Sequence, residues 1–315
     1  MKLHGVIPAI ITPLDDQGDL DTKALEDQVS YLSQAGVQGF FIGGTTAEGA
    51  YLSTEELRRA YTIVRGASQG RQYLCVASLR ASTAMVREEV AALADLEPDF
   101  LVIIAPYYMA VSQADILYHF REILKGAPAP VIVYNIPGTT HNPIALDTVL
   151  ELAREPGVAG TKDSSGDFIG FSRGVLDHRD GGSDHRGGGS RRGNAGTRRS
   201  DGGFSWIQGE DYLHGPSLLI DAQGMVTGLG NVRIDDYVTM YRASQEADWE
   251  TVKEMQRRIN RLYGIIRALG GRTIPAIKAA ISAQGRCRPW MRNPSMTASA
   301  ADLEAVEKVL ASLES

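Results

Sequence analysis

Cysteine is scarce in this chain of 315 residues, which contains only Cys75 and Cys287. Neither has the spacing of a metal site or a cluster of other ligands near it in the sequence. The pattern therefore gives no support to a cysteine-based metal centre. We expect both residues to be free thiols, either buried or simply unreactive.

An excess of positive charge is also missing, because the formal net charge is −6 and the isoelectric point is about 5.6. This balance gives no broad attraction to nucleic acid or to an anionic membrane. It does not exclude a small anionic substrate, which local groups would bind. We therefore expect neither nucleic acid nor a membrane as a partner.

Long apolar runs are absent as well. No run of about 18 apolar residues could cross a bilayer, and Met1–Pro8 lacks the apolar stretch of a signal peptide. The sequence therefore predicts a soluble, cytoplasmic protein.

What the chain does contain is a regular alternation of short β-rich apolar runs with amphipathic segments, and its apolar content of 43% is ample for a core. The alternation predicts a parallel sheet closed into a barrel. A doubly wound open sheet is the alternative, but no predicted strand is followed by a Gly-x-Gly-x-x-Gly turn. The predicted strands are Val6–Thr12, Gly39–Gly44, Tyr73–Ser78, Phe100–Pro106, Val131–Ile136, Val158–Lys162, Phe204–Gly209 and Met225–Gly230. The predicted helices between them include Thr22–Gln34, Thr54–Ala67, Thr83–Leu96, Gln113–Leu124 and Ile144–Arg154.

The pattern changes after Asn231, beyond which only helical periodicity remains, as in Ile274–Ala283 and Ala301–Leu313. A single α/β barrel takes about 250 residues, so a barrel with a small appendage fits the length. We predict a TIM (β/α)8 barrel over residues 1–232 and a C-terminal helical domain over 233–315 that packs on the barrel without contributing chemistry.

Residues 177–203 do not follow this rhythm. They form a degenerate seven-residue repeat of Gly, Arg and Asp without a large apolar side chain. Such a segment cannot bury enough surface to offset its ordering entropy, so we predict a mobile surface loop on the barrel face opposite the active site. His178 and His185 could bind a metal and the arginines nucleic acid, but we favour an expanded tandem repeat or a locally shifted reading frame.

One lysine, Lys162, ends a predicted apolar strand and is followed at once by a turn. Strand C-terminal ends are where barrel enzymes place their chemistry. A lysine must lose its proton to act as a nucleophile, and burial among apolar strands penalises the ammonium form. Attack on a ketone then gives a Schiff base that accepts electrons from the adjacent carbon. Tyr134, at the end of the neighbouring strand, is a candidate acid or base.

A second strand end carries Gly43-Gly-Thr-Thr-Ala-Glu-Gly49. Its small residues, two hydroxyls and exposed backbone N–H groups suit a carboxylate. Such turns also serve simply as caps, and Glu48 could equally be a charge at a helix N-terminus. The turn alone is a weak signal for anion binding.

Taken together, the motifs resemble those of the dihydrodipicolinate synthase / N-acetylneuraminate lyase family, over essentially the whole chain except 177–203. The motifs, in the order of that family, are Gly5-Val-Ile-Pro-Ala-Ile-Ile-Thr-Pro13, Gly44-Thr-Thr-Ala-Glu48, Pro106-Tyr-Tyr108, Tyr134-Asn-Ile-Pro137, Gly160-Thr-Lys-Asp-Ser-Ser-Gly166 and Gly224-Met-Val-Thr-Gly-Leu-Gly-Asn231. The resemblance implies a class I, Schiff-base aldolase or lyase that handles pyruvate, and usually a homotetramer. It implies no cofactor and no metal beyond the covalent Schiff base.

The resemblance also implies a role for each matching residue. Lys162 corresponds to the Schiff-base lysine and Tyr134 to the general acid or base. Thr45 and Thr46 correspond to the pair that binds the pyruvate carboxylate and relays protons. Tyr108 corresponds to a tyrosine that reaches into a neighbouring subunit's site. Two further positions line the site: Gly209, through its backbone carbonyl, and Val226, as an apolar wall.

The substrate loop departs from that of the synthases. They typically carry an arginine two residues after the proline of Tyr134-Asn-Ile-Pro137, where it holds the aldehyde's carboxylate, and this chain has Thr139. The loop also differs from that of sialic-acid lyases. We therefore expect activity on 2-keto-3-deoxy sugar acids, with Thr139 and His141 near the hydroxyls. Arg80 could reach a distal acid group, although a solvated or interface arginine is the favoured interpretation.

Several alternatives stay open at this point. Within the family they are dihydrodipicolinate synthase, N-acetylneuraminate lyase and a keto-deoxy sugar acid dehydratase, because all share the lysine, tyrosine and threonines. Outside catalysis, the barrel could be an impaired scaffold that only binds a 2-oxo acid. Joint retention of Lys162, Tyr134, Tyr108 and both threonines favours an enzyme.

Overall fold

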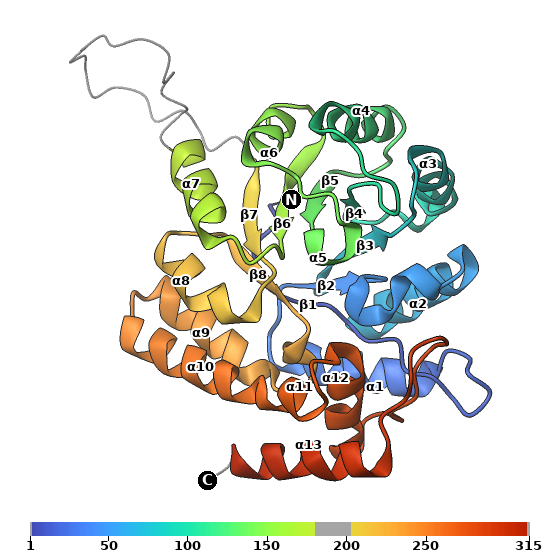
Figure 1. The fold of residues 1–315 in the computed structure, drawn as a ribbon, viewed down its shortest axis with the longest axis vertical. Coiled ribbons are helices and arrows are strands. Elements are labelled where there is room, and N and C mark those ends of the chain that lie inside the picture. The colour runs from blue at the N-terminus through green and yellow to red at the C-terminus, as the bar shows by residue number, and fades with distance from the viewer. Residues whose placement is uncertain (1, 180–202, 314–315) are drawn as a thin grey trace.

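The computed structural model describes residues 2–179 and 203–313. Its centre is a ring of parallel strands hydrogen-bonded in the order β1-β8-β7-β6-β5-β4-β3-β2, with helices around the outside (Figure 1). The strands are β1 (Gly5–Pro8), β2 (Gly39–Ile42), β3 (Tyr73–Ser78), β4 (Phe100–Ile104), β5 (Val131–Asn135), β6 (Val158–Asp163), β7 (Ser205–Gln208) and β8 (Gly224–Thr227). The predicted barrel is confirmed, and the ends of β2, β5 and β6 meet at one face.

The ring closes between β1 and β2 through a short bridge in place of a regular ladder. Ala9 pairs with Phe41, and the Ile10 N–H donates to the Phe41 carbonyl at 3.0 Å. The Gln38 side chain accepts from the Val6 N–H at 2.8 Å. A side-chain amide therefore replaces a backbone partner at this seam.

Helices surround the strands, and their starts follow side-chain caps. Before α2, the Ser53 hydroxyl accepts from the Glu56 N–H while the Glu56 carboxylate accepts from the Ser53 N–H, which satisfies two otherwise unpaired donors. The helices are α1 (Thr22–Gln34), α2 (Thr54–Ser68), α3 (Thr83–Ala92), α4 (Gln113–Leu124), α5 (Pro137–Thr140), α6 (Leu146–Leu152), α7 (Phe168–Arg179), α8 (His214–Leu219), α9 (Ile234–Gln245), α10 (Trp249–Leu262), α11 (Gly264–Ala268), α12 (Thr273–Ala283) and α13 (Ala300–Ser312).

The strand side chains alternate between two apolar layers, as the pleat requires. On β5, Ile132 and Tyr134 belong to the layer inside the barrel, together with Phe41 and Ile207. Val133 belongs to the layer between the strands and the outer helices. This alternation places every second residue of a strand toward the barrel axis.

Some predicted boundaries are wrong, each for a local reason. β1 ends at Pro8 and not at Thr12 because the chain turns from Ala9 toward β2. β8 ends at Thr227 because its hydroxyl accepts from the Gly230 N–H at 2.8 Å and starts a 3-10 turn. The helix predicted over 83–96 stops at Ala92 and gives way to a separate 3-10 turn, Ala94–Leu96.

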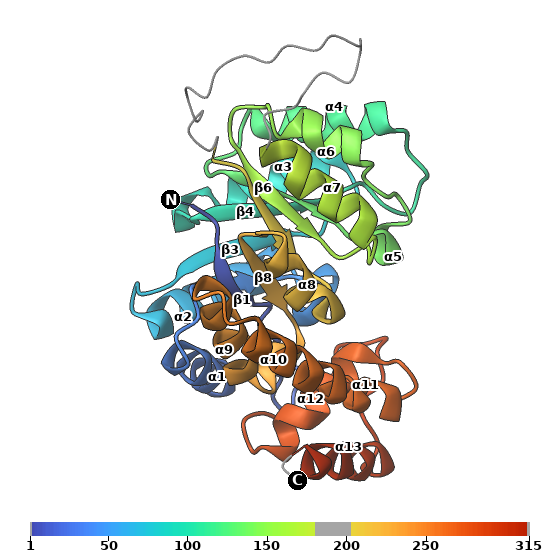
Figure 2. The ribbon, with the colours of Figure 1, turned by 90° about the vertical axis from the view of Figure 1, so that its left-hand side faces the viewer.

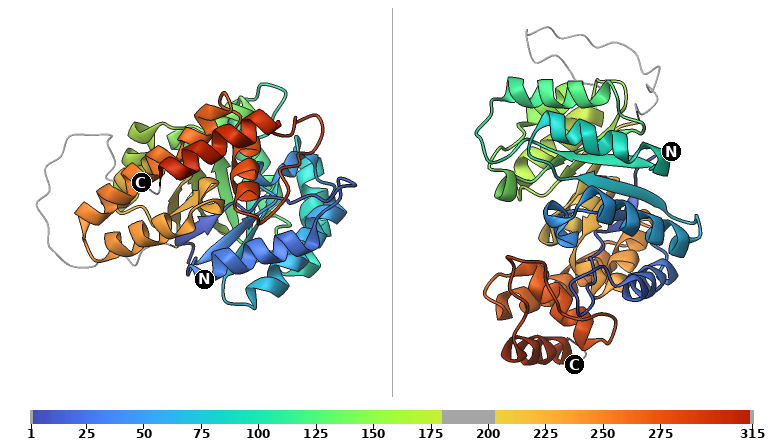
Figure 3. Two further views of the ribbon diagram at one scale, coloured as in Figure 1. Left: turned by 90° about the horizontal axis from the view of Figure 1, so that it is seen from below. Right: turned by 90° about the vertical axis from the view of Figure 1, so that its right-hand side faces the viewer.

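Helices α11, α12 and α13 gather at the lower end of the molecule (Figures 1 and 2), and α13 lies outermost at that end (Figure 3). Arg272, which precedes α12, pairs with Asp302 of α13 at 2.7 Å. The division into domains at residue 232 stays a prediction. Within residues 2–179 and 203–313, none of the helices combines the length and the apolar character needed to cross a membrane.

The seven-residue repeat predicted as a loop over 177–203 falls largely outside the described residues. At its start, residues 177–179 belong to α7, so the helix extends further than the repeat boundary predicts. The His178 ring packs against Phe204, with ring centroids 5.3 Å apart. His185, its proposed partner in metal binding, lies outside the described residues.

His119 on α4 is a buried histidine with both ring nitrogens hydrogen-bonded. Nε2–H donates to the Ile104 carbonyl at 3.1 Å, which leaves Nδ1 to accept from the Thr83 hydroxyl at 2.9 Å. Burial lowers the pKa of His119 from 6.5 to about 4, and the bond to Ile104 opposes this only in part.

A pH dependence of stability follows from His119. Between pH 6.5 and about 4 the unfolded chain takes up a proton that the folded chain does not, so this contribution is complete above pH 6.5 and is lost as the pH falls toward 4. We expect a loss of about 3 kcal/mol across this window. Urea unfolding at a series of pH values would measure it, and His119→Gln should unfold with a flatter profile. Identical pH profiles for the two proteins would contradict this assignment.

Candidate active site

Lys162 lies near the C-terminal end of β6 and is 5% exposed. It is the register partner of Tyr134 on β5. Its Nζ lies 3.9 Å from the centre of the Tyr134 ring and 4.2 Å from the centre of the Phe41 ring. The amino group is therefore enclosed by aromatic faces at the barrel axis, as the strand-end position predicts.

Polar residues next to Lys162 tie the ends of β5 and β6 together. The Asn135 amide donates to Asp163 Oδ2 at 2.8 Å, and Asp163 Oδ1 accepts from both the N–H and the hydroxyl of Ser165. Burial raises the pKa of the Asp163 carboxyl, against the lowering effect of these bonds. This role of Asp163 was not among the predictions. Its signal was the Asp-Ser-Ser sequence after the strand, typical of a side chain that bonds to the backbone two residues on.

Gly209 and Val226 both lie beside Lys162. A Cβ atom added to Gly209 would stand 3.0 Å from Lys162 Cε and 2.1 Å from the Ser164 hydroxyl, so only glycine fits there. Val226 and Lys162 share a small void inside the barrel. Both residues therefore lie next to the lysine, and their roles in lining the site stay predictions.

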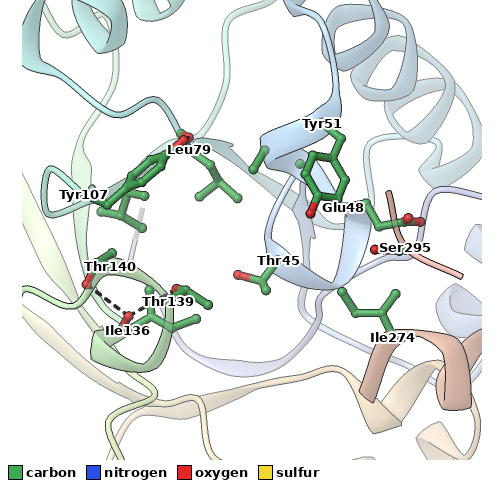
Figure 4. A pocket seen from close by; sticks show the side chains of 13 residues that line it. Thr45, Glu48, Tyr51, Leu79, Tyr107, Ile136, Thr139, Thr140, Ile274 and Ser295 are labelled. Atoms are coloured by element: carbon green, nitrogen blue, oxygen red, sulfur yellow. Dashed lines mark hydrogen bonds between the residues drawn. The ribbon is translucent and has the colours of Figure 1, made fainter. Parts of the chain in front are cut away.

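A cavity of about 410 Å³ opens at the same end of the barrel (Figure 4). It adjoins Tyr134 through Ile104, which lines the cavity and is Tyr134's register partner on β4. Predicted residues Thr45 and Thr139 line it, and the hydroxyls of Thr139 and Thr140 both donate to the Ile136 carbonyl. Its lining residues are Thr45, Glu48, Gly49, Ala50, Tyr51, Leu79, Ile104, Tyr107, Ile136, Thr139, Thr140, Ile274 and Ser295.

The wall of this cavity is not formed by the barrel alone. Ile274 belongs to α12 and Ser295 to the segment before α13. The C-terminal part therefore does more than pack on the barrel, while the expectation that it contributes no chemistry stays a prediction. Its side chains help to shape the cavity.

The turn after β2 uses three of its own backbone donors. The N–H groups of Ala47 and Gly49 both donate to the Gly44 carbonyl, and the Glu48 N–H donates to the Thr45 carbonyl, each at 3.0 Å. These three donors are thus not left for a ligand, and for the other N–H groups of the turn the expected binding of a carboxylate stays a prediction. The hydroxyls of Thr45 and Thr46 are among the groups that the turn offers.

Thr46 lies toward β8 and α12 and not in the wall of the cavity. A Cβ atom added to Gly228 would stand 3.2 Å from Thr46 Oγ1 and 3.3 Å from Ile277 Cδ1. Thr46, Gly228 and Ile277 therefore meet at one point. The two adjacent threonines face different surroundings.

Glu48 is neither a free helix charge nor an anion-binding group. Its carboxylate pairs with Lys278 of α12, and both side chains are almost fully buried. Burial lowers the pKa of Lys278, although the Glu48 carboxylate opposes this. The pair was not among the predictions. The signal for it was a single lysine inside the apolar helix Ile274–Ala283.

Arg80 does not reach the cavity as a free cation. Its guanidinium pairs with the buried Glu89 and donates to the Leu52 carbonyl at 2.9 Å. This arrangement agrees neither with binding a distal acid group nor with a solvated arginine, and a position at an interface stays a prediction. Arg80 joins α3 to the segment before α2.

Tyr108 does not line the cavity and is 91% exposed, with a φ of 75°. This backbone conformation is costly for a non-glycine residue. The preceding Tyr107 lines the cavity instead and donates to the Leu79 carbonyl at 3.2 Å. Within one chain, the structure does not bring Tyr108 together with Lys162.

Both cysteines are unpaired, as expected. Burial raises the pKa of the Cys75 thiol, and it raises the pKa of Cys287 to about 11. In the described part of the chain, no group of three or more His, Cys, Asp and Glu side chains could hold a metal ion. The absence of a cofactor stays a prediction.

The model of the dihydrodipicolinate synthetase family matches residues 2–183 and 186–313. The chain belongs to this family. The match includes much of 177–203, which the motifs alone left out.

The chain is similar to its relatives over nearly the whole length of both proteins. It is 29% identical to a 4-hydroxy-tetrahydrodipicolinate synthase of Corynebacterium aurimucosum, over 97% of this chain and 92% of that protein. It is 27% identical to an uncharacterized DapA-like lyase of Halobacterium salinarum, over 99% of this chain and 95% of that protein.

Solved structures of the family share the fold. Dihydrodipicolinate synthase from Bacteroides thetaiotaomicron has a TM-score of 0.86 at 26% identity, covering 98% of each chain. The chloride-inhibited synthase from Acinetobacter baumannii, solved with pyruvate, has a TM-score of 0.87 at 23% identity, covering 99% of each chain. As a member of this family, the chain is an enzyme of the class I aldolase type.

Proposed function

We propose that the chain joins pyruvate to an aldehyde, or cleaves the corresponding 2-keto acid, through a Schiff base on Lys162. The observation that carries this proposal is the setting of Lys162 among the rings of Tyr134 and Phe41 at the end of β6. The other buried lysine, Lys278, is held in an ion pair by Glu48. The pyruvate complex of the Acinetobacter baumannii relative supports the choice of keto acid.

The chemistry requires one covalent intermediate. The neutral Lys162 amine attacks C2 of pyruvate, and loss of water leaves a protonated imine. Removal of a C3 proton sends its electron pair into the imine, and the resulting enamine carbon attacks the aldehyde carbonyl. Hydrolysis of the product imine frees the lysine, and cleavage is the same sequence in reverse.

The remaining site residues would bind and move protons. Tyr134, whose ring contacts the Lys162 amino group, is placed to exchange protons with the imine and the new alcohol. Thr45 and Thr46 would hold the carboxylate and extend the relay. The Gly209 backbone and Val226 would confine the imine carbon, because both already adjoin the lysine.

Tyr108 would act in the site of a second copy. Its exposure and its costly backbone conformation suit a residue that another subunit fixes. We propose a homotetramer on this basis and on the family resemblance.

Among aldehyde partners, the named relatives favour aspartate semialdehyde and hence a 4-hydroxy-tetrahydrodipicolinate synthase. This is the first candidate, in place of the sugar-acid preference expected from Thr139. N-acetylneuraminate cleavage and sugar-acid dehydration have less support from the comparisons.

A second candidate, cleavage of 2-keto-3-deoxy sugar acids, is favoured by one feature of the cavity. No arginine or lysine is found among its described lining residues, and Thr139 and Ser295 offer hydroxyls instead. A polyhydroxylated aldehyde needs no cationic partner there. Side-by-side kcat/KM values for aspartate semialdehyde condensation and sugar-acid cleavage would decide between the candidates.

Thr139→Arg should raise kcat/KM for aspartate semialdehyde by about tenfold. A charge-assisted bond to a carboxylate contributes about 1.5–3 kcal/mol, and about 1.4 kcal/mol corresponds to a factor of ten. Steady-state kinetics would measure the change, with Thr139→Gln as a control that adds bulk without charge. Equal values for the arginine and glutamine variants would show that residue 139 does not face the aldehyde's carboxylate.

A further inference from the structure

The turn that carries Thr45 and Thr46 is held by the C-terminal helices through one carboxylate. Glu48 accepts a hydrogen bond from Lys278 Nζ on one oxygen and from the Arg292 N–H, at 2.7 Å, on the other. Lys278 also donates to the Trp290 carbonyl at 2.8 Å. Helix α12 and the segment 290–292 are thereby joined to the turn after β2.

Glu48 is well placed to transmit this anchoring to the threonines. It stands between the 3-10 turns Thr45–Ala47 and Gly49–Tyr51, with φ of 57° and ψ of 31°. A non-glycine residue keeps this left-handed conformation only where its surroundings fix it. On the preceding residue, the Ala47 carbonyl accepts from the Thr12 hydroxyl at 2.7 Å, so the segment that follows β1 also supports the turn.

Helix α12 also comes close to Thr46. Ile277, which precedes Lys278, and Thr46 converge on Gly228. A change in how α12 sits against the barrel would therefore move both the Glu48 anchor and the packing of Thr46.

Packing alone does not require a charge at position 278. Lys278 is 0% exposed and lies on a helix whose neighbouring side chains are apolar. Burying an ion pair is costly, and an apolar pair of similar volume is often at least as stable. Directional bonds, in contrast, fix Glu48 in one orientation. The lysine also neutralises a carboxylate on the wall of a cavity that would admit an anionic keto acid.

We infer that Glu48 and Lys278 are positioning residues, which set the hydroxyls of Thr45 and Thr46 for the pyruvate carboxylate and for proton transfer at C3. The inference rests on the proposed function, because it concerns the same pyruvate site. It adds the C-terminal helices to the parts of the chain that determine turnover.

The test separates imine formation from proton transfer. Exchange of the pyruvate methyl protons in D2O, followed by NMR, reports C3 proton transfer without any aldehyde. Borohydride trapping of pyruvate on Lys162 reports imine formation. The variants are Glu48→Gln, Lys278→Met and the two combined, and the combined variant leaves no lone buried charge if a single variant fails to fold.

We expect each folded variant to trap pyruvate at saturating concentration but to exchange its protons at least about tenfold more slowly than the wild type, since small misplacements of catalytic groups cost factors of this size. The matched control is Glu56→Gln, which weakens the separate ion pair between Arg292 and α2 and should keep the wild-type exchange rate.

Two outcomes would overturn the inference. One is a folded double variant that exchanges protons within about twofold of the wild type. The other is an equal loss in Glu56→Gln, which would indicate a general effect of loosening the C-terminal segment. A wild-type protein that neither traps nor exchanges pyruvate would instead overturn the proposed function itself.

Discussion

Lys162→Met is expected to abolish pyruvate trapping and to lower turnover by at least about 10³-fold, because removing a covalent nucleophile removes the intermediate on which every later step depends. Methionine keeps the length and apolar packing of the side chain between Tyr134 and Phe41. The fold should therefore persist. Pyruvate with borohydride, followed by mass measurement and peptide mapping, checks the result.

Lys278 provides the internal control for this trapping experiment. It is as buried as Lys162, but its ammonium is paired with Glu48 and bonded to the Trp290 carbonyl. The wild-type adduct should map to Lys162 alone. Trapping that persists in Lys162→Met, or an adduct on Lys278, would show that the nucleophile is misassigned.

Tyr134→Phe is expected to lower kcat by about 10²-fold or more, the usual contribution of a positioned acid or base. Only the hydroxyl is lost. The ring would keep its place inside the barrel and its edge-to-face contact with Phe41, where the ring centres are 5.9 Å apart. Borohydride trapping should continue at saturating pyruvate, while proton exchange and turnover fall.

Tyr73→Phe is the matched control for Tyr134→Phe. Tyr73 also lies in the layer inside the barrel, but its hydroxyl donates to the His4 carbonyl near the start of β1. Its loss should affect stability more than kcat. Wild-type turnover in Tyr134→Phe would remove Tyr134 from the catalytic assignment.

The barrel could be predicted from sequence because its signals are local. Each strand is a short apolar run between turn residues, and helix starts such as Ser53 with Glu56 follow a known capping pattern. The boundaries were less accurate because single local hydrogen bonds and turns decide them. Thr227 ends β8 by accepting from Gly230, and no propensity of the residues themselves indicates this bond.

The candidate site also has a part that could be predicted from the sequence and a part that could not. The position of Lys162 at the end of β6, beside Tyr134 of β5, follows from strand order, because strand order brings neighbouring strand ends together. The partners of Glu48 and Arg80 do not follow from strand order. Such pairing depends on side chains that are distant in sequence, or on which of several cations pairs with a given carboxylate. A lone lysine in an apolar helix shows that a buried partner is needed but does not say which one.

The residues joined by the bond between Glu48 and Lys278 are 230 positions apart in the chain. The ribosome therefore adds Lys278 long after Glu48. At about 5–20 residues per second, a ribosome adds these positions in roughly 12–46 seconds. During that interval the turn with both threonines exists without its anchor, and the β2 end carries a carboxylate with no buried cation to meet it. The pocket can therefore reach its competent arrangement only late in the synthesis of each molecule. A chain that stops before α12 would carry the nucleophile and both threonines but not the ammonium group that pairs with Glu48.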